Sequence, residues 1–278
     1  MVRSGFAKTA LSAGLFLFAI GSSGCDSTNT TVNPNPSPTP STGRIAMVSA
    51  GPNVYQFYGV GPNILLATSP NGETITHVAF GTNALYISAG VNLYNVFGGT
   101  NTLLGTAPNG ATITSFSPST NGSAVFISAG PNVYEVNNGG SDVLVASSPN
   151  GETITNLAFG TNALYISAGV NLYNVFGGTN TLLGTAPNGA TITSFSPSTN
   201  GSAVFISAGP NVYEVNNGGP DILVTSSPNG ETITGLAFVT NGVYISAGEV
   251  LYNVFDGANL VLGVTPSGDA ITSFSPDN

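Results

Sequence analysis

The sequence predicts an all-β fold in which one four-stranded antiparallel unit is repeated along the chain. The first observation is a recurring "SAG" signature, whose successive copies are separated by 39, 40, 39, 40 and 39 residues. The copies begin at Ser49, Ser88, Ser128, Ser167, Ser207 and Ser246. The second observation is that short runs of Val, Ile, Leu, Phe and Tyr, bounded by Gly and Asn, surround every copy. The third is that no segment combines helical periodicity with a helix cap.

The first 24 residues are expected to be a secretory signal peptide. "MVRSGFAKTALSAGLFLFAIGSSGC" has a basic start, an apolar run over 10–20 that is too short to span a bilayer, and then small residues. Cys25, the only cysteine, follows at once, so the segment resembles a bacterial lipoprotein signal, although Ser22 stands where these signals usually have Leu. The resemblance implies lipidation of Cys25 and an exported protein anchored to a membrane of the cell envelope. The alternative is ordinary signal cleavage that leaves a free thiol.

Residues 25–43 are expected to be a disordered tether. "DSTNTTVNPNPSPTPSTG", from Asp26 to Gly43, has almost no large apolar side chains and is dense in Pro, Ser, Thr and Asn. Such a segment cannot bury enough surface to offset the entropy of ordering, and its prolines favour extended polyproline II conformations. We therefore expect it to hold a folded domain away from the membrane.

The charge balance excludes one class of partner. A mature chain starting at Cys25 keeps one basic residue, Arg44, against 12 acids, so its formal charge is 1 − 12 = −11 with His77 neutral. Nucleic-acid binding requires clustered Lys and Arg to neutralise phosphates. We therefore expect no nucleic-acid partner.

A longer repeat lies above the short one. Residues 84–162 and 163–241 are each 79 residues long and differ at only five places. The differing pairs are Ser141/Pro220, Val143/Ile222, Ala146/Thr225, Asn156/Gly235 and Gly160/Val239. A cassette of two units was therefore duplicated.

One unit shows the four expected strands. They cover Ala124–Ile127, Val133–Val136, Val143–Ala146 and Ile154–Phe159. The intervening "AGPN", "NNGGSD" and "SPNGE" supply the Gly and Asn that tight turns require. Four antiparallel strands in about 40 residues, repeated along the chain, resemble the blades of a β-propeller.

The two ends of the repeat region predict a closed ring over residues 44–278. The first unit begins with "RIAMVS" at Arg44 and lacks the strand that precedes every other unit, whereas the terminal "DAITSFSPDN" supplies such a strand with no unit after it. Joining them completes a sixth blade and leaves no open sheet edge at the junction. We predict a six-bladed β-propeller, with a β-solenoid as the alternative. The units lack the "WD" dipeptide and the Trp patterns of several propeller classes, and a superfold does not determine a function.

Few residues suit nucleophilic catalysis. His77 is the only histidine, Cys25 would be blocked by lipid, and beyond the signal peptide the chain has no lysine. His77 in "ETITHVAF" aligns with Asn156 and Gly235, which indicates a position tolerant of change. We therefore predict no catalytic residue.

Acidic turns are the most regular candidate site. The position before each innermost strand is Glu73, Ala111, Glu152, Ala190, Glu231 and Asp269 in successive blades. A ring would place the four acids on one face, together with the neighbouring Asn71, Asn150 and Asn229, where they could bind a ligand or calcium. The alternative is that "PNGE" and "PSGD" are tight turns with a solvated acid. No other cofactor is expected.

A tyrosine also recurs after each "SAG" turn, at Tyr55, Tyr94, Tyr134, Tyr173, Tyr213 and Tyr252. These rings could stack on sugars, but packing between blades is the favoured interpretation. The sequence thus favours a monomeric, non-enzymatic recognition module that binds a glycan, peptide or protein of the envelope through its turns. A calcium-dependent hydrolase resembling lactonase propellers and a structural scaffold without a small ligand are the alternatives.

Overall fold

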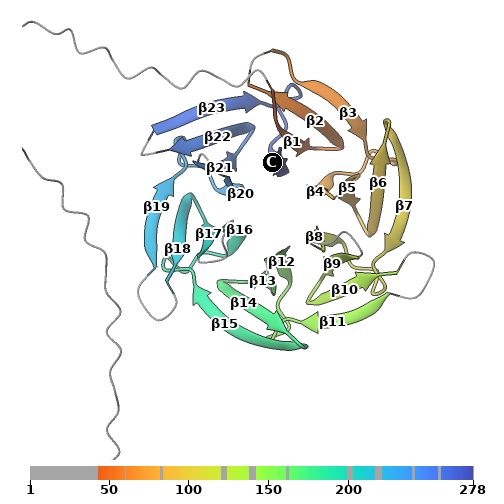
Figure 1. The fold of residues 1–278 in the computed structure, drawn as a ribbon, viewed down its shortest axis with the longest axis vertical. Helices are drawn as coiled ribbons and strands as arrows, with labels where there is room; N and C mark the ends of the chain where they lie inside the picture. The colour runs from red at the N-terminus through yellow and green to blue at the C-terminus, as the bar shows by residue number, and fades with distance from the viewer. Residues whose placement is uncertain are drawn as a thin grey trace, which may run out of the picture. The chain divides into compact units, whose positions relative to one another are not determined.

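The repeat region forms a ring of six four-stranded antiparallel sheets (Figure 1). The computed structural model describes residues 43–59, 61–81, 84–119, 124–137, 142–160, 163–198, 203–216, 221–239, 242–255 and 258–277. The predicted signal peptide, Cys25 and the predicted tether up to residue 42 lie outside the described residues. Within the described residues every regular element is a strand, and no helix is long and apolar enough to cross a membrane. The all-β prediction and the six-bladed propeller are confirmed.

Each blade has one strand at each of four positions from the channel to the rim. The innermost strands are β4 (Ile75–Phe80), β8 (Ile113–Pro118), β12 (Ile154–Phe159), β16 (Ile192–Pro197), β20 (Ile233–Val239) and β24 (Ile271–Pro276). The second strands are β1 (Arg44–Ala50), β5 (Leu85–Ala89), β9 (Val125–Ala129), β13 (Leu164–Ala168), β17 (Val204–Ala208) and β21 (Gly242–Ala247). The third strands are β2 (Asn53–Tyr58), β6 (Asn92–Phe97), β10 (Asn132–Val136), β14 (Asn171–Phe176), β18 (Asn211–Val215) and β22 (Val250–Phe255). The outer strands are β3 (Ile64–Thr68), β7 (Thr100–Thr106), β11 (Val143–Ser147), β15 (Thr179–Thr185), β19 (Ile222–Ser226) and β23 (Ala258–Val264).

The ring closes through the two ends of the repeat region, as their sequences predict. Blade 1 has the strand order β24-β1-β2-β3, so its innermost strand comes from the C-terminus and the other three from the start of the repeat region. Val48 lies opposite Phe274 in this pairing, and Asp277 donates its backbone N–H to Ile45 O. Blades 2 to 6 follow as β4–β7, β8–β11, β12–β15, β16–β19 and β20–β23. The run Ile154–Phe159 therefore begins the next blade and does not end the unit in which it was read.

The core lies between neighbouring blades and not within one. Met47 and Val54 of blade 1 pack with Ile75 and Ile87 of blade 2, and equivalent clusters fill the other junctions. The six tyrosines that follow the "SAG" turns lie in these clusters and are only 7–8% exposed. Packing between blades, and not sugar stacking, is thus the role that their position supports.

Candidate functional site

The acidic turns and the "SAG" turns lie at the same end of every blade. Ile75, which begins β4, pairs with Ala89, which ends β5, so the turn before β4 and the turn after β5 are neighbours. The same pairing joins Ile154 to Ala168. Neighbouring blades are linked at this end because the N–H that begins each innermost strand binds the glycine carbonyl of the preceding blade, as Ile113 N does to Gly90 O at 2.8 Å. These turns together form one face of the ring, called here the turn face.

The predicted acids are exposed on this face, and each lies beside a turn of its own blade. Glu73 covers Gly90, and a Cβ placed on that glycine would come within 2.8 Å of the Glu73 carboxylate. Gly90 also has a φ of +55°, so both the backbone and the nearby carboxylate favour glycine here. The same arrangement recurs for Glu152 over Gly169, Glu231 over Gly248 and Asp269 over Gly51.

The four acids do not converge on one point. Among the described residues, no group of three or more His, Cys, Asp or Glu side chains lies close enough together to hold a metal ion. Asn71 and Asn150 are exposed in the same turns as their acids, whereas Asn229 donates to Glu231 Oε2 at 2.8 Å. The acids therefore do not fit one shared calcium ion, and they form a set of separate, equivalent positions.

The turn face carries acids that no described basic side chain balances. Glu249 adds a fifth exposed acid, in the turn between β21 and β22 of blade 6, and it lies near Gly268. Arg44 is the only Lys or Arg in the described part of the chain, and it starts β1 at the opposite end from the Ala50–Asn53 turn. No basic side chain of the described residues therefore offsets the acids of this face.

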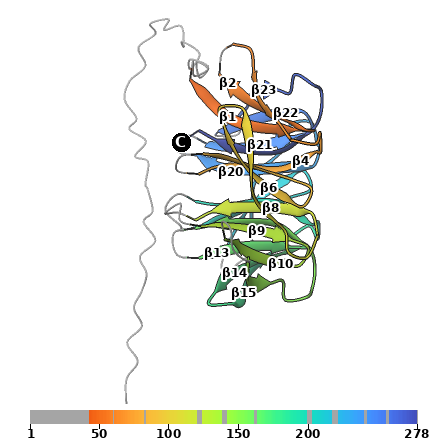
Figure 2. The ribbon, with the colours of Figure 1, turned by 90° about the vertical axis from the view of Figure 1, so that its right-hand side faces the viewer.

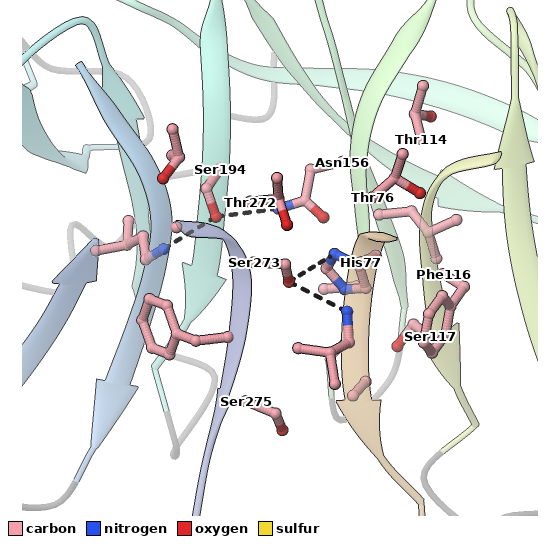
Figure 3. Close-up of a pocket in the computed structure, with 18 of the residues that line it drawn as sticks. Thr76, His77, Thr114, Phe116, Ser117, Asn156, Ser194, Thr272, Ser273 and Ser275 are labelled. Carbon is pink, nitrogen blue, oxygen red and sulfur yellow. Dashed lines mark hydrogen bonds between the residues drawn. The ribbon is translucent and has the colours of Figure 1, made fainter. Parts of the chain in front are cut away.

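A ring of six threonines surrounds the central channel, one on each innermost strand. Figure 3 labels Thr76, Thr114 and Thr272 of this ring. Each Oγ1 donates to the isoleucine carbonyl of the next blade at 2.6–2.7 Å, beginning with Thr76 to Ile113 and ending with Thr272 to Ile75. Each also lies 2.8–3.0 Å from the buried "SAG" serine hydroxyl of its own blade. The threonines therefore link neighbouring blades around the whole ring.

His77 lies in the next layer of the channel, in contact with Ser273. Its Nδ1 is 3.1 Å from Ser273 Oγ, and its ring meets Phe116 edge-on at 5.0 Å (Figure 3). Ser115 makes the same contact with Asn156, at 2.7 Å, in the equivalent pair of blades. Burial lowers the pKa of His77 to about 4, so the ring is neutral at pH 7. His77 thus takes the structural position that an amide takes elsewhere.

The channel offers little for acid–base catalysis. The described residues around its cavity include no Asp, Glu, Lys, Arg or Cys, so the Ser273–His77 pair has no acidic partner there. The cavity has a volume of about 190 Å³, whereas ligand pockets usually enclose about 300–1,000 Å³. No catalytic role for His77 follows from this geometry.

The threonine ring was missed from the sequence, although a signal for it exists. "IT" begins the innermost strand in all six copies, and "SAG" supplies the partner serine in all six. The threonine and serine hydroxyls that recur in all six copies predict a repeated contact. Neither motif predicts the hydrogen bond from each threonine to the next blade, because that bond depends on how the blades are placed.

No protein-family model and no curated protein matches the chain. Many solved structures share its fold. A chain of the nidogen/laminin complex has a TM-score of 0.72 at 8% identity, over 84% of this chain and 98% of that chain. A streptogramin B lyase has a TM-score of 0.64 at 9% identity, over 85% and 88%, and the WD40 β-propeller domain of Doa1 has 0.59 at 10%, over 81% and 80%. At such identities the similarity shows the fold alone.

Proposed function

We propose that the protein is a non-enzymatic recognition module of the bacterial cell envelope, held to a membrane by a lipid on Cys25, which binds a glycan, peptide or protein through its turn face. The observation that carries this proposal is the repeated set of exposed acids at Glu73, Glu152, Glu231 and Asp269. They occupy equivalent positions on one face and do not gather into a single pocket. Equivalent weak sites can act together through avidity.

The channel supports a binding role over a catalytic one. Its threonine hydroxyls already donate hydrogen bonds between blades, and its histidine is neutral. Its cavity is smaller than most ligand pockets. The turn face, in contrast, is broad and carries polar side chains without a matching positive charge. Such a surface suits a large partner with cationic groups, because complementary charge speeds and orients association.

The comparisons are compatible with this proposal. One similar chain belongs to the nidogen/laminin complex, in which two proteins bind one another. Another is a lyase, so the fold serves both binding and catalysis. The choice between them therefore depends on the site and not on the fold.

Binding to an array of glycans and cell-wall fragments tests the proposal. The probe is the soluble domain, residues 42–278, alongside a variant with Glu73→Ala, Glu152→Ala and Glu231→Ala together. We expect saturable binding by the parent domain that the triple variant loses. No binding under any condition would reject a glycan or cell-wall ligand for this face and favour a scaffold role.

The calcium-dependent hydrolase is the second candidate, because the acids that would recruit a cation are exposed and an enzyme shares the fold. Calcium bound at these acids should raise the melting temperature of the soluble domain. The triple variant should then lose that increase. A melting temperature that calcium leaves unchanged, or raises equally in the triple variant, would reject this candidate.

A further inference from the structure

A second cavity lies where blade 1 meets blade 2, and its lining differs from the repeated pattern. It has a volume of about 370 Å³, within the usual range for ligand pockets of about 300–1,000 Å³. Its walls include Arg44, Met47 and Gln56 from blade 1 and Phe80 and Phe97 from blade 2. Arg44 and Phe80 lie at strand ends remote from the turn face. The cavity, called here the junction pocket, is thus independent of the acidic turns.

Two changes from the repeat open this pocket. Phe126 packs on Phe159 at 4.6 Å between ring centroids, and Phe205 stacks on Phe238 at 4.7 Å. In blade 1 the matching position holds Met47, which pairs with Gln56 just as Phe126 pairs with Glu135. The thinner methionine leaves space over Phe80, and the change from Glu to Gln removes a negative charge from the wall.

Arg44 occupies part of the freed space and brings an unused hydrogen-bond donor. Its guanidinium lies 4.8 Å from the centre of the Phe80 ring and forms an ion pair with Asp277 through Nη2. Its Nε is buried and has no hydrogen-bond partner. A buried donor without a partner loses the solvation that water would give it, and the loss is greater when the group is charged. An oxygen acceptor placed in the pocket would recover that loss.

The charges favour a neutral ligand over an anion. Asp277 already neutralises Arg44, so a carboxylate would place a second negative charge on the same guanidinium. The whole chain also carries a formal charge of −9, which opposes the approach of an anion. The apolar walls favour a ligand with an apolar body. The pocket volume of about 370 Å³ would hold a ligand of about a dozen water-sized groups.

We propose that the junction pocket binds a small uncharged molecule with an aromatic or aliphatic body and a carbonyl or hydroxyl oxygen, which accepts a hydrogen bond from Arg44 Nε. Met47, Phe80 and Phe97 contact the apolar body. Gln56 offers both a donor and an acceptor to a second polar group. Among the described residues, Met47 and Arg44 come together only where the two chain ends meet. The position of Met47 is occupied by Phe126 and Phe205 in blades 3 and 5 and by Tyr86, Tyr165 and Tyr244 in blades 2, 4 and 6.

Ligand-observed NMR with the full chain in detergent tests this proposal, using phenylacetamide and phenylacetate as probes. We expect the amide to bind and the carboxylate to bind more weakly. The variant Met47→Phe restores the residue of blades 3 and 5, so it should fill the pocket, keep the fold and abolish amide binding. Arg44→Ser should weaken amide binding by about tenfold, the value of one hydrogen bond to a charged group.

Three results with the two probes and Met47→Phe would overturn the proposal, and a fourth comes from a control variant. The three are tighter binding of phenylacetate than of phenylacetamide, amide binding that Met47→Phe leaves unchanged, and no binding of either probe. The matched control is Phe126→Met, which should thin the junction between blades 3 and 4 without providing an arginine. An equal gain of amide binding in that variant would show that space alone, and not Arg44, determines affinity.

Discussion

At the scale of single residues, polar contacts that recur from blade to blade join the innermost strands around the channel. One position on these strands differs between the blades. Ser115 and Ser194 flank Asn156 and both bond to it. Gly235 replaces that asparagine in the next cassette, and the ring of Phe274 lies where its side chain would be. His77 is the third version of this position, and it is the one that responds to pH.

The substitution His77→Asn should remove an acid-sensitive contribution to stability. The folded pKa of about 4 lies below the ordinary value of 6.5, so the unfolded chain binds the proton more readily. The contribution is therefore complete above pH 6.5 and is lost as the pH falls towards 4. At pH 4.5 the loss is about 2–3 kcal/mol.

Denaturant unfolding of both proteins at pH 7 and pH 4.5 measures this effect. The acids titrate alike in both proteins, so the difference between them isolates His77. We expect the parent protein to lose about 2–3 kcal/mol more than His77→Asn between the two pH values. An equal loss in both proteins would contradict the buried, neutral state of His77.

Removing one member of the threonine ring should weaken the ring. Thr114→Val keeps the shape of the side chain but deletes the hydrogen bond to Ile154 O and the contact with Ser128 Oγ. We expect a loss of about 1–2 kcal/mol in the free energy of unfolding. Thr102→Val on the exposed face of β7 is the control and should change it by less than about 0.5 kcal/mol. Equal effects in the two variants would show that the ring adds nothing.

At the scale of elements, the most consequential strand is β24. β24 pairs with β1 and completes blade 1, so it joins the last part of the chain to the first part of the repeat region. Val48 and Ala50 of β1 are fully buried against this strand. Without β24, apolar surface and a row of backbone groups in β1 would be left unpaired.

A chain that ends at residue 268 should therefore fail to fold cooperatively. Circular dichroism during heating should show no sharp transition, and a synthetic peptide of residues 269–278 should restore one when added in excess. The peptide with Ile271→Asp is the control and should restore nothing. A sharp unassisted transition in the shortened chain would contradict the role of β24 as the closing strand.

The outer strands are exposed edges that carry apolar side chains. Leu65, Leu144 and Leu223 are each 54–56% exposed and lie opposite the buried tyrosines of the third strands. Changing all three to Lys should leave the melting temperature nearly unchanged and should reduce light scattering in concentrated solution, because charge on an edge strand opposes pairing between molecules. Increased scattering, or a large fall in melting temperature, would contradict this account of the rim.

The sequence predicted the strands and the ring better than the site. Turn glycines and apolar runs are local signals, and the incomplete first unit and surplus last strand both indicate closure. The threonine ring and the junction pocket depend on contacts between blades, for which no local signal exists. Arg44 illustrates this limit, because its importance comes from Phe80 and Asp277, which lie 36 and 233 residues away in sequence.

At the scale of the whole molecule, the ring has two chemically different ends. The turn face carries repeated acids without a described basic residue, and the opposite end carries Arg44 and the junction pocket together with acids such as Asp142, Asp221 and Asp277. Figure 2 shows the ring from the side, with the strands running between these two ends. The proposed recognition role belongs to the first end and the proposed small-molecule site to the second, so each can be altered separately.

The most direct measurement is a calorimetric titration of the strongest array ligand with two charge-matched variants. One carries Glu152→Gln and Glu231→Gln on the turn face, and the other carries Glu135→Gln and Glu214→Gln further along β10 and β18. We expect the first pair to weaken binding by about tenfold, since each exposed charge pair contributes up to about 1 kcal/mol, and the second pair to leave it nearly unchanged. Equal loss in both variants, or none in either, would contradict recognition through the turn face.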